Sequence, residues 1–132
     1  MDAAIDTGRI RERLRALSKS LLGAQFRAEI AAFIAESDPP FWARQVASRL
    51  GIPENKVSSE LSRFASDGLL VAISVADWDR RKLYERSQGT SMYWRGAYEL
   101  LERAAEEEAH RVGATKERAL RAYLDEVCEE VR

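Results

Sequence analysis

The fold is decided by residues 46–64, which read VASRLGIPENKVSSELSRF. Val46 and Leu50 stand four positions apart, a spacing typical of one face of a short helix. Gly51 can adopt the left-handed conformation that ends a helix, and Pro53 suits the start of the next one. The stretch therefore predicts two short helices joined by a tight turn, a helix-turn-helix.

The second of these helices is expected over residues 53–67 and is amphipathic. Val57, Leu61 and Phe64 share one face at 100° per residue. The opposite side carries Asn55, Ser59, Ser62 and Arg63, with Lys56 on its flank. These side chains can hydrogen-bond to base edges or phosphates, and the start of such a helix usually reads bases. We therefore interpret residues 53–67 as a DNA recognition helix, against the alternative of an ordinary solvated face.

A charged hairpin is expected next. Residues 69–75 are rich in branched aliphatic side chains and predict a strand, which residues 82–86 pair with on return. The connecting segment includes Arg80, Arg81 and Lys82 in succession. A wing of this kind, expected over residues 75–86, can bind phosphates or enter a narrow minor groove.

Long amphipathic helices are expected on both sides of this unit. The first begins near Thr7, with a break at Gly23, and runs to about Glu36, while residues 91–111 and 114–131 predict two more. Their stripes include Ile10, Leu14, Leu17 and Leu21 in the first helix, and Leu120, Leu124 and Val127 in the last. These stripes exceed what a small winged unit is expected to cover, which favours a symmetric homodimer. The alternative is that the helices fold back on their own domain.

The whole chain is therefore expected to be one domain over residues 1–132. Its class is mainly α with a small β-hairpin wing. A winged helix-turn-helix core spans residues 24–90, and dimerisation helices span residues 8–22 and 91–131.

Composition and charge distribution favour nucleic-acid binding and argue against several classes of enzyme and metal site. The chain has 132 residues with a formal net charge of −1, yet residues 41–95 carry nine basic and six acidic side chains, which favours a nucleic-acid surface there. A single cysteine, Cys128, and a single histidine, His110, exclude an internal disulfide and argue against a metal cluster or a Cys-His or Ser-His enzyme. We expect no cofactor and no catalysis. The apolar runs are too short for a membrane span or a signal peptide, so a cytoplasmic location is expected.

Several segments together resemble the MarR family of bacterial winged-helix repressors. They are Leu50-Gly51-Ile52-Pro53, Val57-Ser58, Leu61, Phe64, Gly68-Leu69-Leu70 and Asp79-Arg80-Arg81. The helix-turn-helix part is shared with ArsR-like and PadR-like regulators. The resemblance implies a homodimer whose first and last two helices interlock. It also implies base contacts by Asn55, Lys56, Ser59 and Arg63, and wing contacts by Arg80 and Arg81.

The leading hypothesis is a homodimeric, sequence-specific regulator of transcription, a repressor, which reads a pseudo-palindromic operator on double-stranded DNA. The alternative is a winged-helix module that binds proteins and not DNA. Tyr93, Trp94, Tyr98 and Tyr123 either line a pocket for a small aromatic effector or belong to the core. The arginines at positions 9, 11, 13 and 15 and the glutamates at 106–108 are expected to be solvated.

Overall fold

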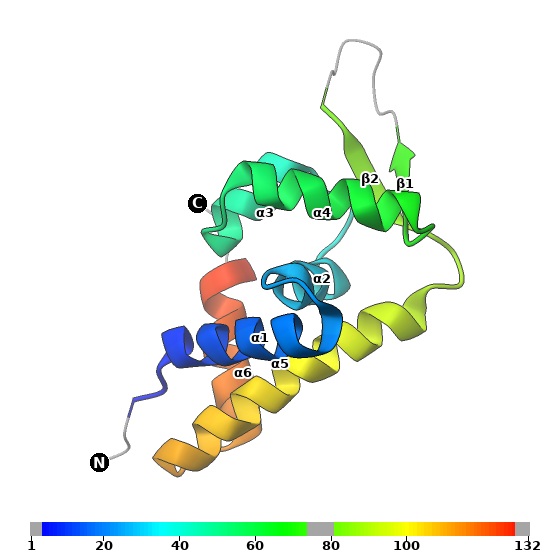
Figure 1. Cartoon of the computed structure of the whole chain (residues 1–132). Coiled ribbons are helices and arrows are strands. Elements are labelled where there is room, and N and C mark those ends of the chain that lie inside the picture. Colours follow the sequence, from blue (N-terminus) through cyan, green and yellow to red (C-terminus); the bar gives the residue numbers. More distant parts are fainter. Residues whose placement is uncertain (1–3, 74–80, 129–132) are drawn as a thin grey trace.

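The computed structural model describes residues 4–73 and 81–128. The elements follow the predicted order of helices and hairpin (Figure 1). They are α1 (Thr7–Leu22), α2 (Arg27–Glu36), α3 (Ala43–Leu50), α4 (Glu54–Ser66), β1 (Leu70–Ile73), β2 (Leu83–Arg86), α5 (Ser91–Val112) and α6 (Lys116–Cys128). The fold class is thus confirmed as mainly helical with a two-stranded antiparallel hairpin.

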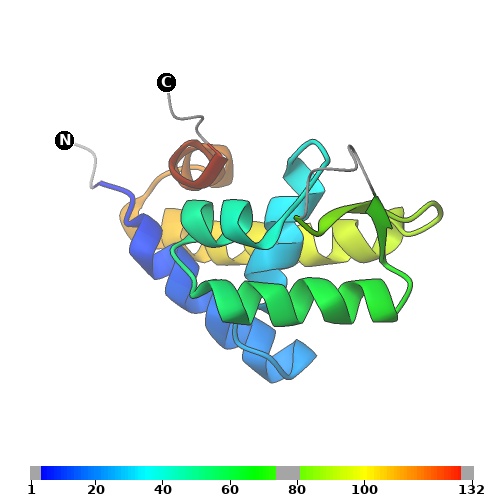
Figure 2. The same ribbon diagram turned by 90° about the horizontal axis from the view of Figure 1, so that it is seen from above.

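The molecule has two regions, which we call the helical body and the winged lobe. The helical body consists of α1, α2, α5 and α6, in which α5 packs against each of the other three helices. The winged lobe consists of α3, α4, β1 and β2, and it lies on one side of the body (Figures 1 and 2). Aliphatic and aromatic side chains of both regions form one continuous core.

The expected first helix is divided into two separate helices. Gly23 has φ 80° and ends α1, where its N–H donates to the carbonyl of Lys19. The buried hydroxyl of Ser18 then accepts a hydrogen bond from the backbone N–H of Ala28 at 2.9 Å and donates to the carbonyl of Ala24. This corner turns α2 onto α5, which explains why the break at Gly23 changes the direction of the chain.

The turn of the helix-turn-helix is closed by backbone hydrogen bonds. Gly51 has φ 66°, and the N–H groups of Gly51 and Ile52 both donate to the carbonyl of Ala47, at 2.9 and 3.2 Å. The following helix begins at Glu54 and ends at Ser66, one residue inside the predicted range at each end.

The recognition helix predicted from sequence, α4, is held by its apolar face. Val57, Leu61 and Phe64 are all buried. The ring of Phe64 packs edge-to-face on Tyr93 and Trp94 of α5, with centroid separations of 5.9 and 5.4 Å. This aromatic cluster joins the winged lobe to the helical body and fixes which side of α4 faces outward.

The hairpin has the expected topology, and each strand starts one residue later than predicted. Residues 74 and 75 of the predicted first strand lie outside the described residues. β1 and β2 pair antiparallel, with Leu70 opposite Arg86 and Ile73 opposite Leu83. Phe41, just before α3, adds a β-bridge to Tyr84. Because both of these aromatic side chains are buried, the bridge fastens the hairpin to the start of α3.

Most residues of the apolar stripes of α1 and α6 are buried within the chain, although we expected a partner chain to cover them. Residues Ile10, Leu14, Leu17, Leu120 and Val127 are buried. α1 packs on α2 and α5, while α6 packs on α5, α1 and α3, so these stripes need no second chain to leave water. Leu21 remains 58% exposed and Leu124 is half-buried. The homodimer itself stays a prediction.

Two carboxylates of the helical body are buried, and one of them, Glu108, was expected to be solvated. Glu29 of α2 is fully buried; its carboxylate accepts from Arg15 at 2.7 Å and lies 3.5 Å from Nε of Arg11. Glu108 of α5 is 3% exposed, whereas its neighbours Glu106 and Glu107 face solvent. Glu108 follows Leu101, Ala104 and Ala105 at helical spacing on the buried side of α5, a position that the run of three glutamates concealed. None of the described helices has the length and hydropathy needed to cross a bilayer.

Candidate nucleic-acid interface

The candidate interface begins with the outer face of α4. All five side chains expected to contact DNA from this helix are exposed: Asn55, Lys56, Ser59, Ser62 and Arg63. Arg63 reaches Asp67 across 4.0 Å, an i,i+4 pair in which both side chains are more than half exposed. Such a pair is weak in water, so it leaves the guanidinium available to another anion.

One flank of α4 is fastened to the helical body. Arg27, at the start of α2, donates to both carboxylate oxygens of Glu60, at 2.8 and 3.4 Å, and to the carbonyl of Leu22. Both charged side chains are about 15% exposed. The hydrogen bonds that Arg27 donates to Glu60 raise the pKa of Arg27 above its ordinary value. This brace, which we call the Arg27–Glu60 brace, limits rotation of α4 about its own axis.

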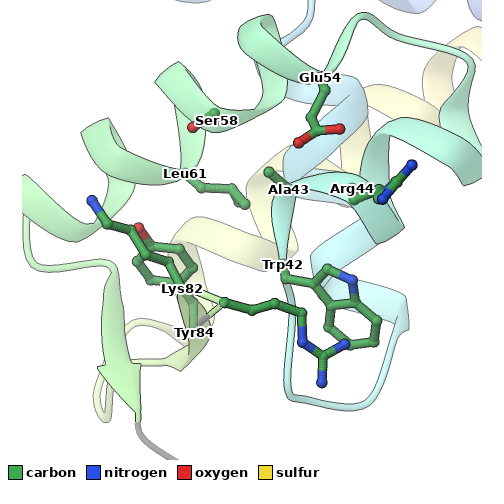
Figure 3. A pocket seen from close by; sticks show the side chains of 9 residues that line it. Trp42, Ala43, Arg44, Glu54, Ser58, Leu61, Lys82 and Tyr84 are labelled. Atoms are coloured by element: carbon green, nitrogen blue, oxygen red, sulfur yellow. The ribbon is translucent and has the colours of Figure 1, made fainter. Parts of the chain in front are cut away.

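The opposite flank of α4 faces a cavity of about 500 Å³ between α3, α4 and β2. Its walls include the buried side chains of Leu61 and Tyr84 and the indole of Trp42. Polar groups also line it, from Arg44, Glu54, Ser58, Arg81 and Lys82. In Figure 3 the side chains of Arg44 and Lys82 stand on opposite sides of the opening, and Glu54 and Ser58 come from α4. We call this cavity the flank cavity.

The basic residues of the wing are only partly where the sequence suggested. Arg80 lies outside the described residues. Arg81 and Lys82 are exposed and stand at the root of β2, since that strand begins at Leu83. The guanidinium of Arg81 stacks over the ring of Trp42, 4.7 Å from its centroid. Arg81 is therefore held against the start of α3 instead of projecting from a hairpin tip.

Sequence reasoning missed the side chain that anchors β2. Arg86 donates to the carbonyls of Ile34 and Ser37 at the end of α2, the latter at 2.9 Å, and lies over the ring of Phe41 at 5.4 Å. A lone arginine in a short strand carries no pattern that points to these partners. Its contacts fix the hairpin's root relative to α2 and so relative to α4.

The aromatic residues considered for an effector pocket belong to the core. Trp94 and Tyr123 are buried, and Tyr93 and Tyr98 are half-buried. Tyr93 and Trp94 pack edge-to-face at 5.0 Å, and burial raises the pKa of the Tyr93 hydroxyl. Within the described part of the chain, no group of three His, Cys, Asp or Glu side chains could hold a metal ion.

Comparison with known proteins finds solved structures with the same winged-helix fold. No family model and no curated protein matches the sequence. Among solved structures, wild-type MarR from E. coli aligns with a TM-score of 0.62 at 15% identity, covering 92% of this chain and 90% of that one. A MarR-family transcriptional regulator from Rhodococcus sp. RHA1 aligns at 0.62 with 17% identity, covering 92% and 86%. A probable transcriptional regulator from Pseudomonas aeruginosa aligns at 0.60 with 15% identity, covering 89% of each chain.

The likeness runs over nearly the whole chain, the helical body as well as the winged lobe. At this level of identity it is a likeness of fold. It confirms the predicted order of helices and hairpin. The chain therefore has the winged-helix fold of MarR-family transcriptional regulators.

Proposed function

We propose that this protein is a sequence-specific DNA-binding regulator of transcription that reads the major groove with α4. The exposed polar face of α4 is the observation that carries the proposal. Asn55, Ser59 and Arg63 face solvent there, while the buried side of the same helix is held by Phe64 and the Arg27–Glu60 brace. Asparagine and arginine recognise adenine and guanine edges, and a rigid helix is what directs them at bases. The solved structures with this fold include proteins described as transcriptional regulators.

The experiment is selection of bound duplexes from a random-sequence pool by the purified protein, followed by affinity measurements on the enriched site. We expect an enriched motif and an affinity that falls as salt rises. Asn55→Ala and Ser59→Ala should change base preference, whereas Arg63→Gln should weaken binding by about tenfold. Arg103→Gln on α5, which removes the same charge from an exposed position of the helical body, is the matched control.

The alternative of a protein-binding module predicts a different result. In that case no motif is enriched, and the protein passes through immobilised DNA at low salt. That outcome would remove the proposed function.

The regulator is further proposed to act as a homodimer and as a repressor. Two recognition helices about 34–36 Å apart meet successive major grooves on one face of a duplex, so a dimer predicts a pseudo-palindromic motif. The exposed Leu21 and half-buried Leu124 are the members of the predicted dimerisation stripes left for a partner. Sedimentation of the free protein measures its mass and so tests the dimer. A reporter gene with the selected site upstream tests repression, which predicts lower expression when the protein is present. A small aromatic effector would be identified as a compound that lowers the protein's affinity for the selected DNA site.

A further inference from the structure

We propose that the flank cavity seats the phosphodiester strand that separates the two grooves contacted by α4 and by the hairpin. The inference rests on the proposed function and assigns a backbone site to Arg44 and Lys82, with Trp42 as a positioning residue. None of Trp42, Arg44 or the cavity itself is part of the exposed face of α4.

The position of the cavity follows from the geometry of α4. At 100° per residue, Leu61, Glu54, Ser58 and Ser62 follow one another around the helix in that order, from the core side to the outer face. The first three line the cavity, and Ser62 is exposed beside it. The cavity therefore opens beside the face that is proposed to read bases.

DNA geometry then places a backbone strand at this opening. A helix in the major groove and a wing in the adjacent minor groove have one sugar-phosphate strand between them. In this fold the space between α4 and the root of β2 is the flank cavity. Its apolar walls, formed by Trp42, Leu61 and Tyr84, suit a deoxyribose, and its cations suit a phosphate.

The charges around the cavity fit an anion. Arg44 and Lys82 are exposed, and neither forms an ion pair with another described residue. With Arg81 they give three positive charges, against one negative charge from Glu54. Arg44 and Lys82 can therefore neutralise DNA phosphates, which releases the counterions condensed on the DNA and is the main source of non-specific DNA affinity.

Trp42 sets the distance between the two sides of the cavity. Trp42 is the residue just before α3, and the guanidinium of Arg81, at the root of β2, stacks on its ring. A stack of this kind is attractive and restrains a long side chain. The hairpin root is thereby held beside the start of α3, and the cations of the two elements face one opening.

The test is DNA binding by the full chain over a range of salt concentrations, using a 30-base-pair duplex of arbitrary sequence. Arg44→Gln and Lys82→Gln are each expected to weaken binding about tenfold and to lower the salt slope by about one. Glu54→Gln, which removes the opposing charge, is expected to strengthen binding about threefold. Arg103→Gln is the control with the same charge change on α5 and no expected effect.

Trp42 is tested by a pair of variants. Trp42→Leu keeps the apolar bulk but removes the aromatic face, so it should weaken binding about fivefold, and Trp42→Phe should restore most of it. The readout is DNA affinity at equal folded fraction, checked by the unfolding midpoint of each variant. Equal losses with leucine and phenylalanine would reduce Trp42 to a packing residue and overturn its positioning role.

The outcomes separate this inference from the proposed function. A wild-type protein that binds no duplex contradicts the proposed function. A protein that binds duplex and depends on Arg63, but keeps its affinity and salt slope in Arg44→Gln and Lys82→Gln, contradicts only the flank site. Saturable binding of inorganic phosphate, lost in the same variants while DNA affinity is unchanged, would make the cavity a small-anion site and also overturn the inference.

Discussion

The helical body and the winged lobe treat charged side chains in opposite ways. In the body, two carboxylates are buried and paired: Glu29 contacts Arg15 and Arg11, and Glu108 accepts two 2.8 Å hydrogen bonds from Arg111 and one from the backbone of Asp6. In the lobe, Asn55, Ser59 and Arg63 of α4 face water. Beside the flank cavity, Arg44 and Lys82 are exposed and form no ion pair with another described residue.

The buried pairs fix the arrangement of the helices, and the exposed cations remain available to a ligand. A buried, paired carboxylate specifies one arrangement of helices, because moving either helix would leave a charge without its partner. An exposed cation adds little to stability and keeps its electrostatic attraction for an external anion. The Arg27–Glu60 brace and the Phe64 cluster join the two regions, so they transmit the rigidity of the body to α4.

The largest expected effect is at the aromatic junction between the regions. Phe64→Ala removes a ring that is 1% exposed and packs on Tyr93 and Trp94, so it should lower the free energy of unfolding by about 3–5 kcal/mol. Phe64→Leu, which refills much of the volume, should cost about 1–1.5 kcal/mol. Urea unfolding measures both. Equal costs for alanine and leucine would mean that this junction is loosely packed.

The second prediction concerns a buried charge of the body. Glu108→Ala leaves Arg111 and the backbone N–H of Asp6 without their acceptor, and should cost about 2–3 kcal/mol in urea unfolding. Glu106→Ala, two residues earlier on the exposed side of α5, should stay within about 0.5 kcal/mol of the wild type. Similar losses at both positions would contradict the contrast between buried and exposed carboxylates.

The third prediction tests the link between the regions. Arg27→Ala and Glu60→Ala should each cost about 1–2 kcal/mol, and a double-mutant cycle should give a coupling energy of about 1 kcal/mol or more. Glu60→Gln keeps one hydrogen bond and should lose less. DNA affinity should fall in these variants even at salt and temperature where they are fully folded, because α4 loses its brace. Additive losses with unchanged DNA affinity would show that the brace does not position α4.

The exposed and buried faces of α4 could be predicted from the sequence, but the contacts that hold α4 and the hairpin in place could not. The face of α4 could be predicted because period 3.6 separates Val57, Leu61 and Phe64 from Asn55, Ser59 and Arg63 within one element. Arg27 and Glu60 lie 33 positions apart, and Trp42 and Arg81 lie on different elements, so no local spacing signals either pair. The stripes of α1 and α6 were attributed to a partner chain because periodicity shows that a face is apolar but not which surface covers it.

The fourth prediction uses pH to separate two buried carboxylates. Hydrogen bonds from Arg111 lower the pKa of Glu108 below its ordinary 4.5, so its contribution to stability is present above that pH and is lost as pH falls. Burial raises the pKa of Glu29 above 4.5, because desolvation outweighs its pairing with Arg15 and Arg11. Protonation of Glu29 is thus favoured in the folded state, and this group adds stability as pH falls from its folded pKa toward 4.5.

Glu108→Gln and Glu29→Gln should therefore change the dependence of unfolding free energy on acid pH in opposite directions. Between pH 7 and pH 3, Glu108→Gln should lose stability less steeply than the wild type, and Glu29→Gln more steeply. Urea unfolding at a series of pH values measures the slopes. Parallel curves for the two variants would contradict the opposite assignments.

The smallest expected effect on stability belongs to the outer face of α4. Substitutions there contrast most strongly with those of the buried carboxylates in the helical body. Asn55→Ala and Arg63→Gln change exposed side chains, and the weak 4.0 Å pair of Arg63 with Asp67 is the only ion pair that either makes among the described residues. Both should unfold within about 0.5 kcal/mol of the wild type. A residue that is neutral for folding but needed for DNA has no structural role to explain its effect, so a loss of affinity in these variants reports contact directly. A stability loss as large as that of Glu108→Ala would instead mean that the outer face of α4 supports the fold, and the division between the two regions would fail.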